Sequence, residues 1–210
     1  MREDEARADR ELAETGQADG ADGTANVPDW EDEYLDRVSD RLMFNYDLEK
    51  DREVAGRTFP LYGKMLIKNQ KQFFIAALRY GYHESTEHLF VDRRDEVTTA
   101  DLEELVALGH ELSDDWITLD DHHFETQFTF VCVVPEIADE VASFVSGFRD
   151  RTLLKHGFKG HYEVNLVVVA PERERVVASE KADVWRAFQL WDSVEAGRTG
   201  LVDRVRGLFG

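Results

Sequence analysis

Two stretches of the sequence place histidine and glutamate in the same pattern. HHFETQFTFVCVVPE runs from His122 to Glu136, and GHYEVNLVVVAPE runs from Gly160 to Glu172. In each, a histidine, an aromatic residue and a glutamate precede an apolar run that ends in Pro-Glu. Imidazole nitrogens and carboxylate oxygens bind zinc and similar divalent ions, and they also serve as general acids and bases. The repeated pattern is therefore the first candidate for chemistry in this chain.

Both stretches read as β-strands, and their geometry decides whether the candidate residues can meet. Side chains alternate in direction along a strand, so His123 and Glu125 are expected on one face, as are His161 and Glu163. A helical pattern lies between the stretches, which favours a parallel, right-handed crossover. If the strands are neighbours, about 4.8 Å apart, all four side chains gather on one face. The corresponding hypothesis is a metal-dependent or acid/base hydrolytic enzyme with a divalent metal such as zinc.

The same residues also fit ordinary strand architecture. Polar side chains at the solvated start of a strand need no function, and His–Glu pairs occur as simple cross-strand contacts. On this interpretation, which leads, the chain has no catalytic residue, metal or cofactor. It is then a non-catalytic binding or scaffold module whose function the sequence does not name.

The remaining patterns predict an acidic disordered tail over 1–27, a single domain over 28–192 and an amphipathic helix over 193–210. Within the domain we expect a helix over 29–48, a strand ending before a turn at 69–71, a returning strand over 73–80, and a strand at 89–93. A helix capped by Thr98 and Asp101 follows, and Pro135 is expected to open another helix. A strand over 161–170, a short strand over 176–178 and a helix near 184–191 complete the domain. This order predicts the α+β class, with a mixed, largely antiparallel sheet of five or six strands and helices mainly on one face.

A third stretch only partly matches a zinc-binding motif. HESTEH, from His83 to His88, separates its histidines by five positions, whereas the helical zinc motif needs four. The surrounding GYHESTEH is expected to be a polar loop between strands.

The charge pattern suggests a second kind of site. The chain has 44 acidic and 25 basic residues, a net charge of -19, yet no acid occurs from 54 to 82 or from 151 to 162. If these windows meet, they form a positive patch that binds an anion, a partner protein or nucleic acid. Its lysines are Lys64, Lys68, Lys71, Lys155 and Lys159. A Lys-rich sheet face that binds nucleic acid is thus a further alternative.

Partners and compartment are also expected from composition. A protein partner or a homodimer fits a binding module, and the basic, amphipathic end of the chain also fits contact with a membrane surface. The single cysteine, Cys132, excludes an intrachain disulfide. The sequence contains no apolar run long enough to span a bilayer and no signal-peptide pattern, so a cytoplasmic location is expected.

A family resemblance rests on two stretches, YLDRVSDRLMFNYDLE and FPLYGKMLIKNQKQFF, with the strand-helix-strand region after them. Together they resemble an uncharacterised domain family of halophilic archaea, over residues 30–192. The resemblance implies an intracellular, halophilic protein, and it brings no activity, cofactor or catalytic residue with it. The acidic, lysine-poor composition is consistent with that setting, because molar salt screens a large like-charge surface.

Overall fold

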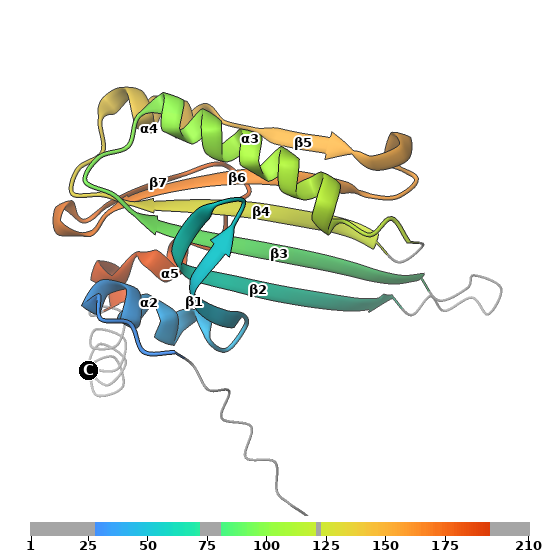
Figure 1. The fold of residues 1–210 in the computed structure, drawn as a ribbon, viewed down its shortest axis with the longest axis horizontal. Helices are drawn as coiled ribbons and strands as arrows, with labels where there is room; N and C mark the ends of the chain where they lie inside the picture. The colour runs from blue at the N-terminus through green and yellow to red at the C-terminus, as the bar shows by residue number, and fades with distance from the viewer. Residues whose placement is uncertain (1–27, 72–80, 121–122, 194–210) are drawn as a thin grey trace, which may run out of the picture.

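The structure is a computed structural model that describes residues 28–71, 81–120 and 123–193. Its centre is a mixed sheet of seven described strands in the order β1-β2-β3-β4-β6-β5, with β7 paired to β6 (Figure 1). The strands are β1 Asp47–Val54, β2 Arg57–Lys71, β3 Gly81–Arg93, β4 His123–Val133, β5 Asp150–Leu153, β6 His161–Ala170 and β7 Arg175–Ala178. The helices are α2 Glu33–Leu42, α3 Thr99–Trp116, α4 Asp139–Gly147 and α5 Trp185–Phe188, with short 3-10 turns at Leu154–Gly157, Pro171–Arg173 and Leu190–Ser193. This architecture confirms the α+β class and the mixed sheet.

The pairing pattern follows the connections. Strands β1, β2 and β3 form an antiparallel meander. The crossover through α3 makes β4 parallel to β3, and the crossover through α4 makes β6 parallel to β4. Strands β5 and β7 both run antiparallel to β6, β5 along its first residues and β7 along its last. The sheet therefore has antiparallel edges around a parallel centre.

Helices cover both faces of this sheet. On one face, α3 and α4 pack over a core that contains Phe90, Phe130 and Val164. On the other, α2 and α5 lie side by side (Figure 1) and cover Leu61, Val131 and their neighbours. Strand β6 is buried along its whole length because it is central and covered on both faces. Among the described helices, none combines the length and apolar character needed to cross a membrane.

Several predicted element boundaries need correction. The first helix covers only 33–42, and residues 47–54 form the edge strand β1, whose mostly exposed charged residues show no apolar alternation. Residues 69–71 continue β2, where Lys71 pairs with Gly81, and the predicted loop GYHESTEH is the first half of β3. The predicted returning strand over 73–80, the tail over 1–27 and residues 194–210 of the predicted last helix lie outside the described residues.

Of the predictions for the elements after β3, some are confirmed and others need correction. Thr98 caps α3 through a capping box with Asp101, as predicted. Helix α4 begins at Asp139 rather than at Pro135. Strand β5 has four residues and was not predicted, while the helix expected near 184–191 is a single turn over 185–188 followed by a 3-10 turn.

Candidate functional site

The two repeated stretches form neighbouring parallel strands. In the register of β4 and β6, Glu125 lies opposite His161 and Gln127 lies opposite Glu163. All four side chains lie on the face that α2 and α5 partly cover, because the buried Val131 and Val167 continue the same alternation along β4 and β6. The pairing therefore brings three of the four predicted side chains together: Glu125, His161 and Glu163.

His123 does not join them. The register between β3 and β4 shifts at this point, so that Glu84 pairs with His123 and the next residue, Ser85, pairs with Glu125. The extra residue, Phe124, reverses the alternation. The His123 ring therefore lies on the opposite face, where Nε2 is 2.9 Å from Thr126 Oγ1 and Nδ1 is 2.7 Å from the Lys159 carbonyl. A carbonyl only accepts, so Nδ1 carries the hydrogen, and His123 ties the start of β4 to the turn before β6.

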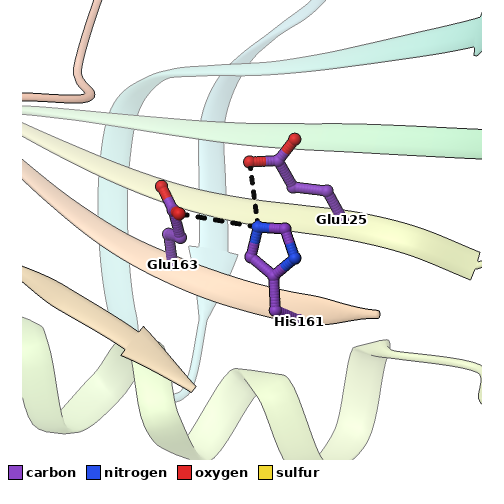
Figure 2. Close-up of side chains that lie close together, drawn as sticks. All are labelled: Glu125, His161 and Glu163. Atoms are coloured by element: carbon purple, nitrogen blue, oxygen red, sulfur yellow. Dashed lines mark ion pairs between the residues drawn. The ribbon is translucent and has the colours of Figure 1, made fainter. Parts of the chain in front are cut away.

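The three remaining side chains form a compact cluster, drawn in Figure 2. Nε2 of His161 lies 3.4 Å from Oε1 of Glu125 and 3.5 Å from Oε1 of Glu163. One donor atom from each of the three residues lies within 4.8 Å of the others. The imidazole nitrogen thus faces a carboxylate on either side.

The cluster is held largely out of water. The side chains of His161 and Glu163 are 8% and 7% exposed, and that of Glu125 is 21% exposed. The Phe124 ring packs edge-on against His161, with centroids 5.9 Å apart. The backbone before β6 approaches the backbone of β4 closely at Gly160. The φ of Gly160 is +75°, and a Cβ at this position would overlap the Phe124 carbonyl group. Glu125 is the most exposed of the three side chains, so the cluster is open to solvent on its side.

Two further side chains contact the cluster. The Gln127 amide donates to Glu125 Oε1 at 2.9 Å, which fixes the orientation of that carboxylate. Arg151, on β5, places Nη2 3.4 Å from Nδ1 of His161 and Nε 3.7 Å from Oε1 of Glu163. Because guanidinium groups only donate, Nδ1 accepts in this arrangement and Nε2 carries the imidazole hydrogen between the two carboxylates.

The same sheet face carries another buried carboxylate. Glu87, on β3, accepts hydrogen bonds from Tyr46 at 2.8 Å and from Thr129 at 2.8 Å. Burial raises the pKa of Glu87 above its ordinary value, and the nearby charge of Glu125 acts in the same direction, while the two hydrogen bonds oppose the change. The carboxylates of Glu87, Glu125 and Glu163 outnumber the guanidinium of Arg151 on this part of the sheet face, which favours binding of a cation.

Comparison with known protein families finds one family model that matches most of the chain. The model described as "Domain of unknown function (DUF8052)" matches residues 31–190. The chain belongs to this family. No curated protein and no solved structure matches the chain.

In this family member, a small pocket adjoins the cluster. It has a volume of about 190 Å³, and Glu163 lies in its wall. Asn165 and Ser179 contribute buried polar groups, and Arg151 and Lys181 contribute positive charge. Asn165 donates to Gln127 Oε1 at 3.3 Å and accepts from Ser179 at 3.3 Å. A line of polar contacts thus runs from Glu125 through Gln127 and Asn165 to Ser179.

A larger pocket, of about 430 Å³, lies on the opposite face of the sheet beside the end of α3. Tyr62, His88 and Trp116 line it, together with His123. Burial raises the pKa of Tyr62 to about 12 and lowers that of His88 to about 4. The Tyr62 hydroxyl therefore keeps its hydrogen and contacts Nδ1 of a neutral His88 at 2.7 Å. Sequence reasoning missed this pocket, because His88 was assigned to a loop.

Three of the five lysines of the predicted patch, Lys64, Lys155 and Lys159, have described side chains. Lys64 lines the larger pocket, on the face opposite to the cluster. Lys155 and Lys159 lie between β5 and β6, and β3 and β4 separate them from β2 in the sheet. The side chains of Lys68 and Lys71 lie outside the described residues. The two acid-free windows therefore do not run along adjacent strands.

Proposed function

We propose that this domain is a binding module for a divalent transition-metal ion, held by Glu125, His161 and Glu163. The observation that carries the proposal is the spacing of the donor atoms. Zinc bonds of about 2.0–2.1 Å in tetrahedral geometry separate neighbouring ligand atoms by about 3.3 Å. The two distances from His161 Nε2, 3.4 Å and 3.5 Å, are close to that separation.

Charge balance supports the same proposal. Two carboxylates and a neutral imidazole carry two negative charges, which a divalent ion neutralises. Burial of two like-charged carboxylates beside one another is costly unless a cation compensates them. Arg151 supplies some compensation, but its side chain is 57% exposed and it lies 3.7 Å from Glu163. A bound ion would balance the charge at closer range.

The donor set selects among ions. One imidazole with two carboxylates suits zinc, manganese or iron(II), whereas calcium and magnesium prefer oxygen ligands throughout. Three protein ligands leave one position of a tetrahedral site for water or another ligand. The open side at Glu125 and the adjoining pocket provide room for that group.

The ligands are also well supported. All three lie on paired central strands of the sheet, so their backbone positions are rigid. Gln127 orients Glu125 through its 2.9 Å hydrogen bond. Outer contacts of this kind typically change metal affinity by about 10- to 100-fold when they are removed. A Gln127→Leu variant should therefore bind the metal more weakly while retaining all three ligands.

The proposal is tested by metal analysis and titration of the full chain. Protein purified in high salt without chelator should contain close to one equivalent of metal, and stripped protein should take up one zinc ion by calorimetry. His161→Ala should weaken binding by more than about 100-fold, since a ligand matters more than an outer contact. His156→Ala, at an exposed turn, is the matched control and should bind as the wild type does.

Two outcomes would contradict the proposal. The first is uptake of zinc by His161→Ala and His156→Ala with equal affinity. The second is a folded wild-type protein that takes up no metal. Glu125→Gln is a second ligand variant at a less buried position, so that a folding defect in His161→Ala does not decide the result. Far-UV circular dichroism establishes that each variant is folded.

We also propose that the protein works in the cytoplasm of a halophilic archaeon. The support is compositional: 44 acidic residues stand against 25 basic ones. At about 1 M salt the Debye length is about 3 Å, so a dense acidic surface costs little there. Unfolding measured against potassium chloride concentration should show stability rising well into the molar range. A protein equally stable in dilute buffer would contradict this setting.

A further inference from the structure

The pocket beside the cluster carries an inference about what occupies the fourth position of the metal. We infer that the metal-loaded protein binds a small oxyanion of the phosphate type there, between the metal and Arg151. The inference rests on the proposed metal site. It follows from what metal binding does to Arg151.

Arg151 has two partners in the cluster, and metal binding removes one of them and weakens the contact with the other. Its Nη2 donates to Nδ1 of His161 at 3.4 Å, and its Nε lies 3.7 Å from Glu163 Oε1. A metal on Nε2 of His161 requires a lone pair on that atom, so the hydrogen of the neutral imidazole moves to Nδ1. Two donors then face each other. The Glu163 carboxylate, meanwhile, is shared with the metal.

The guanidinium remains charged, because arginine does not lose its proton in proteins. Its side chain is 57% exposed, so it has room to turn. Arg151 already lines the adjoining pocket. A guanidinium binds phosphate and carboxylate groups through paired N–H donors, which makes an oxyanion the natural new partner.

Metal binding also makes the net charge of the pocket wall more positive, which favours an anion. Its wall contains three acids and three bases: Asp150, Glu163, Glu180, Arg149, Arg151 and Lys181. Arg149 pairs with Glu180 at 2.7 Å, and Asp150 lies 3.2 Å from Nε2 of His110. Once Glu163 binds the metal, Arg151 and Lys181 are left with a positive excess. The pocket then attracts an anion, which the metal-free protein does not favour.

The size of the pocket limits the anion. A volume of about 190 Å³ corresponds to about six waters at about 30 Å³ each. A phosphate with a few waters fits that space, whereas a nucleotide fills a much larger pocket. The buried Asn165 and Ser179 border the space and offer further polar contacts. The ligand class is thus a small oxyanion bound jointly by metal and arginine.

The experiment uses cobalt(II) as the metal and inorganic phosphate as the anion. Cobalt in a site with three protein ligands absorbs visible light, and a change of its fourth ligand changes that spectrum. Phosphate should alter the spectrum of the cobalt-loaded wild type. Calorimetry should show at least about 10-fold weaker phosphate binding to the metal-free protein, because only the metal-loaded form offers both contacts.

Arg151→Gln separates the arginine from the metal. This variant should bind cobalt as tightly as the wild type or more tightly, because a positive charge beside the metal has been removed. Its cobalt-loaded form should bind phosphate at least about 10-fold more weakly. Arg173→Gln, an exposed arginine outside the pocket, is the control and should match the wild type in both titrations.

Each result has a definite meaning. If cobalt binds but phosphate binds equally well with and without it, or equally well to Arg151→Gln, the oxyanion inference is wrong and the metal site stands. If cobalt does not bind to the folded wild type, both proposals fail together. A cobalt-loaded wild type that binds no phosphate also overturns the inference.

Discussion

Acidification should destabilise this protein through one histidine, His88. Its side chain is buried on β3, 7% exposed, in a group of aromatic rings. The imidazole stacks on Phe128 with centroids 5.5 Å apart, meets Trp116 at 4.9 Å, and contacts the Tyr62 hydroxyl through Nδ1. Burial, with a smaller contribution from the charge of Lys64, lowers the pKa of His88 to about 4.

The direction of the effect follows from proton binding. In the unfolded chain a histidine takes up a proton near pH 6.5, whereas the folded protein resists protonation of His88 until about pH 4. Between these values the unfolded state binds more protons, so the free energy of unfolding falls as the pH falls. The contribution is fully present above pH 6.5. The gap between the two pKa values corresponds to a loss of roughly 3 kcal/mol.

The assay is urea unfolding across this pH window, for the wild type and for His88→Asn. Asparagine places an amide oxygen near the position of Nδ1, so it keeps an acceptor for Tyr62 and removes the titration. The wild type should lose roughly 3 kcal/mol relative to His88→Asn between pH 6.5 and pH 4. Parallel stability curves for the two proteins would refute the reasoning. His156→Asn, at an exposed position, should follow the wild type.

Three further predictions concern single positions. Gly160→Ala should cost at least about 3 kcal/mol in urea unfolding, because its Cβ meets the Phe124 carbonyl. Gly157→Ala, with φ of +86° and no atom within 4 Å of the new Cβ, should cost only about 1 kcal/mol; equal costs would contradict the contact. Glu87→Gln should flatten the loss of stability that sets in as the pH rises through the raised pKa of Glu87, and an unchanged pH profile would argue against a titrating Glu87. Cys132, with its pKa raised to about 12 by burial, should react with a thiol reagent only after unfolding; rapid labelling of the native protein would show otherwise.

Part of the fold was predictable because local patterns were strong. Strands β4 and β6 contain long apolar runs that alternate with polar residues only at their starts. Helix α3 begins with a capping box at Thr98 and carries buried leucines at helical spacing. In such segments the local preference and the tertiary environment agree. The α+β class followed from their order.

Other strands could not be predicted from their residues. Strand β1, DLEKDREV, is an exposed edge whose charged side chains need no apolar partner. The first half of β3 is polar because helices do not fully cover that end of the sheet, and it read as a loop. Strand β5 has four residues and exists through its pairing with β6. These segments are strands because a neighbour supplies their hydrogen bonds.

The candidate site was also only partly predictable from the sequence. Alternation along each strand placed Glu125, His161 and Glu163 on predictable faces of their own strands. The same alternation failed for His123, because one extra residue in the β3–β4 register turned its side chain to the opposite face. Arg151 begins one of the two acid-free windows of the sequence, but its contact with His161 was not predicted. The pairing of β5 with β6 places Arg151 opposite Glu163, and no local sequence pattern predicts that pairing.

The sequence by itself determined the class of fold, the apolar strands at its centre and the kinds of donor groups that begin them, because these depend on short-range periodicity and composition. Only the tertiary structure decided that β4 and β6 are adjacent, that their register sets Glu125 opposite His161, and that His123 leaves the group. Strand order and register come from the packing of whole faces and from crossovers between distant segments. A shift of one residue in that packing reverses every side chain after it, so the metal-binding geometry exists only in the assembled sheet.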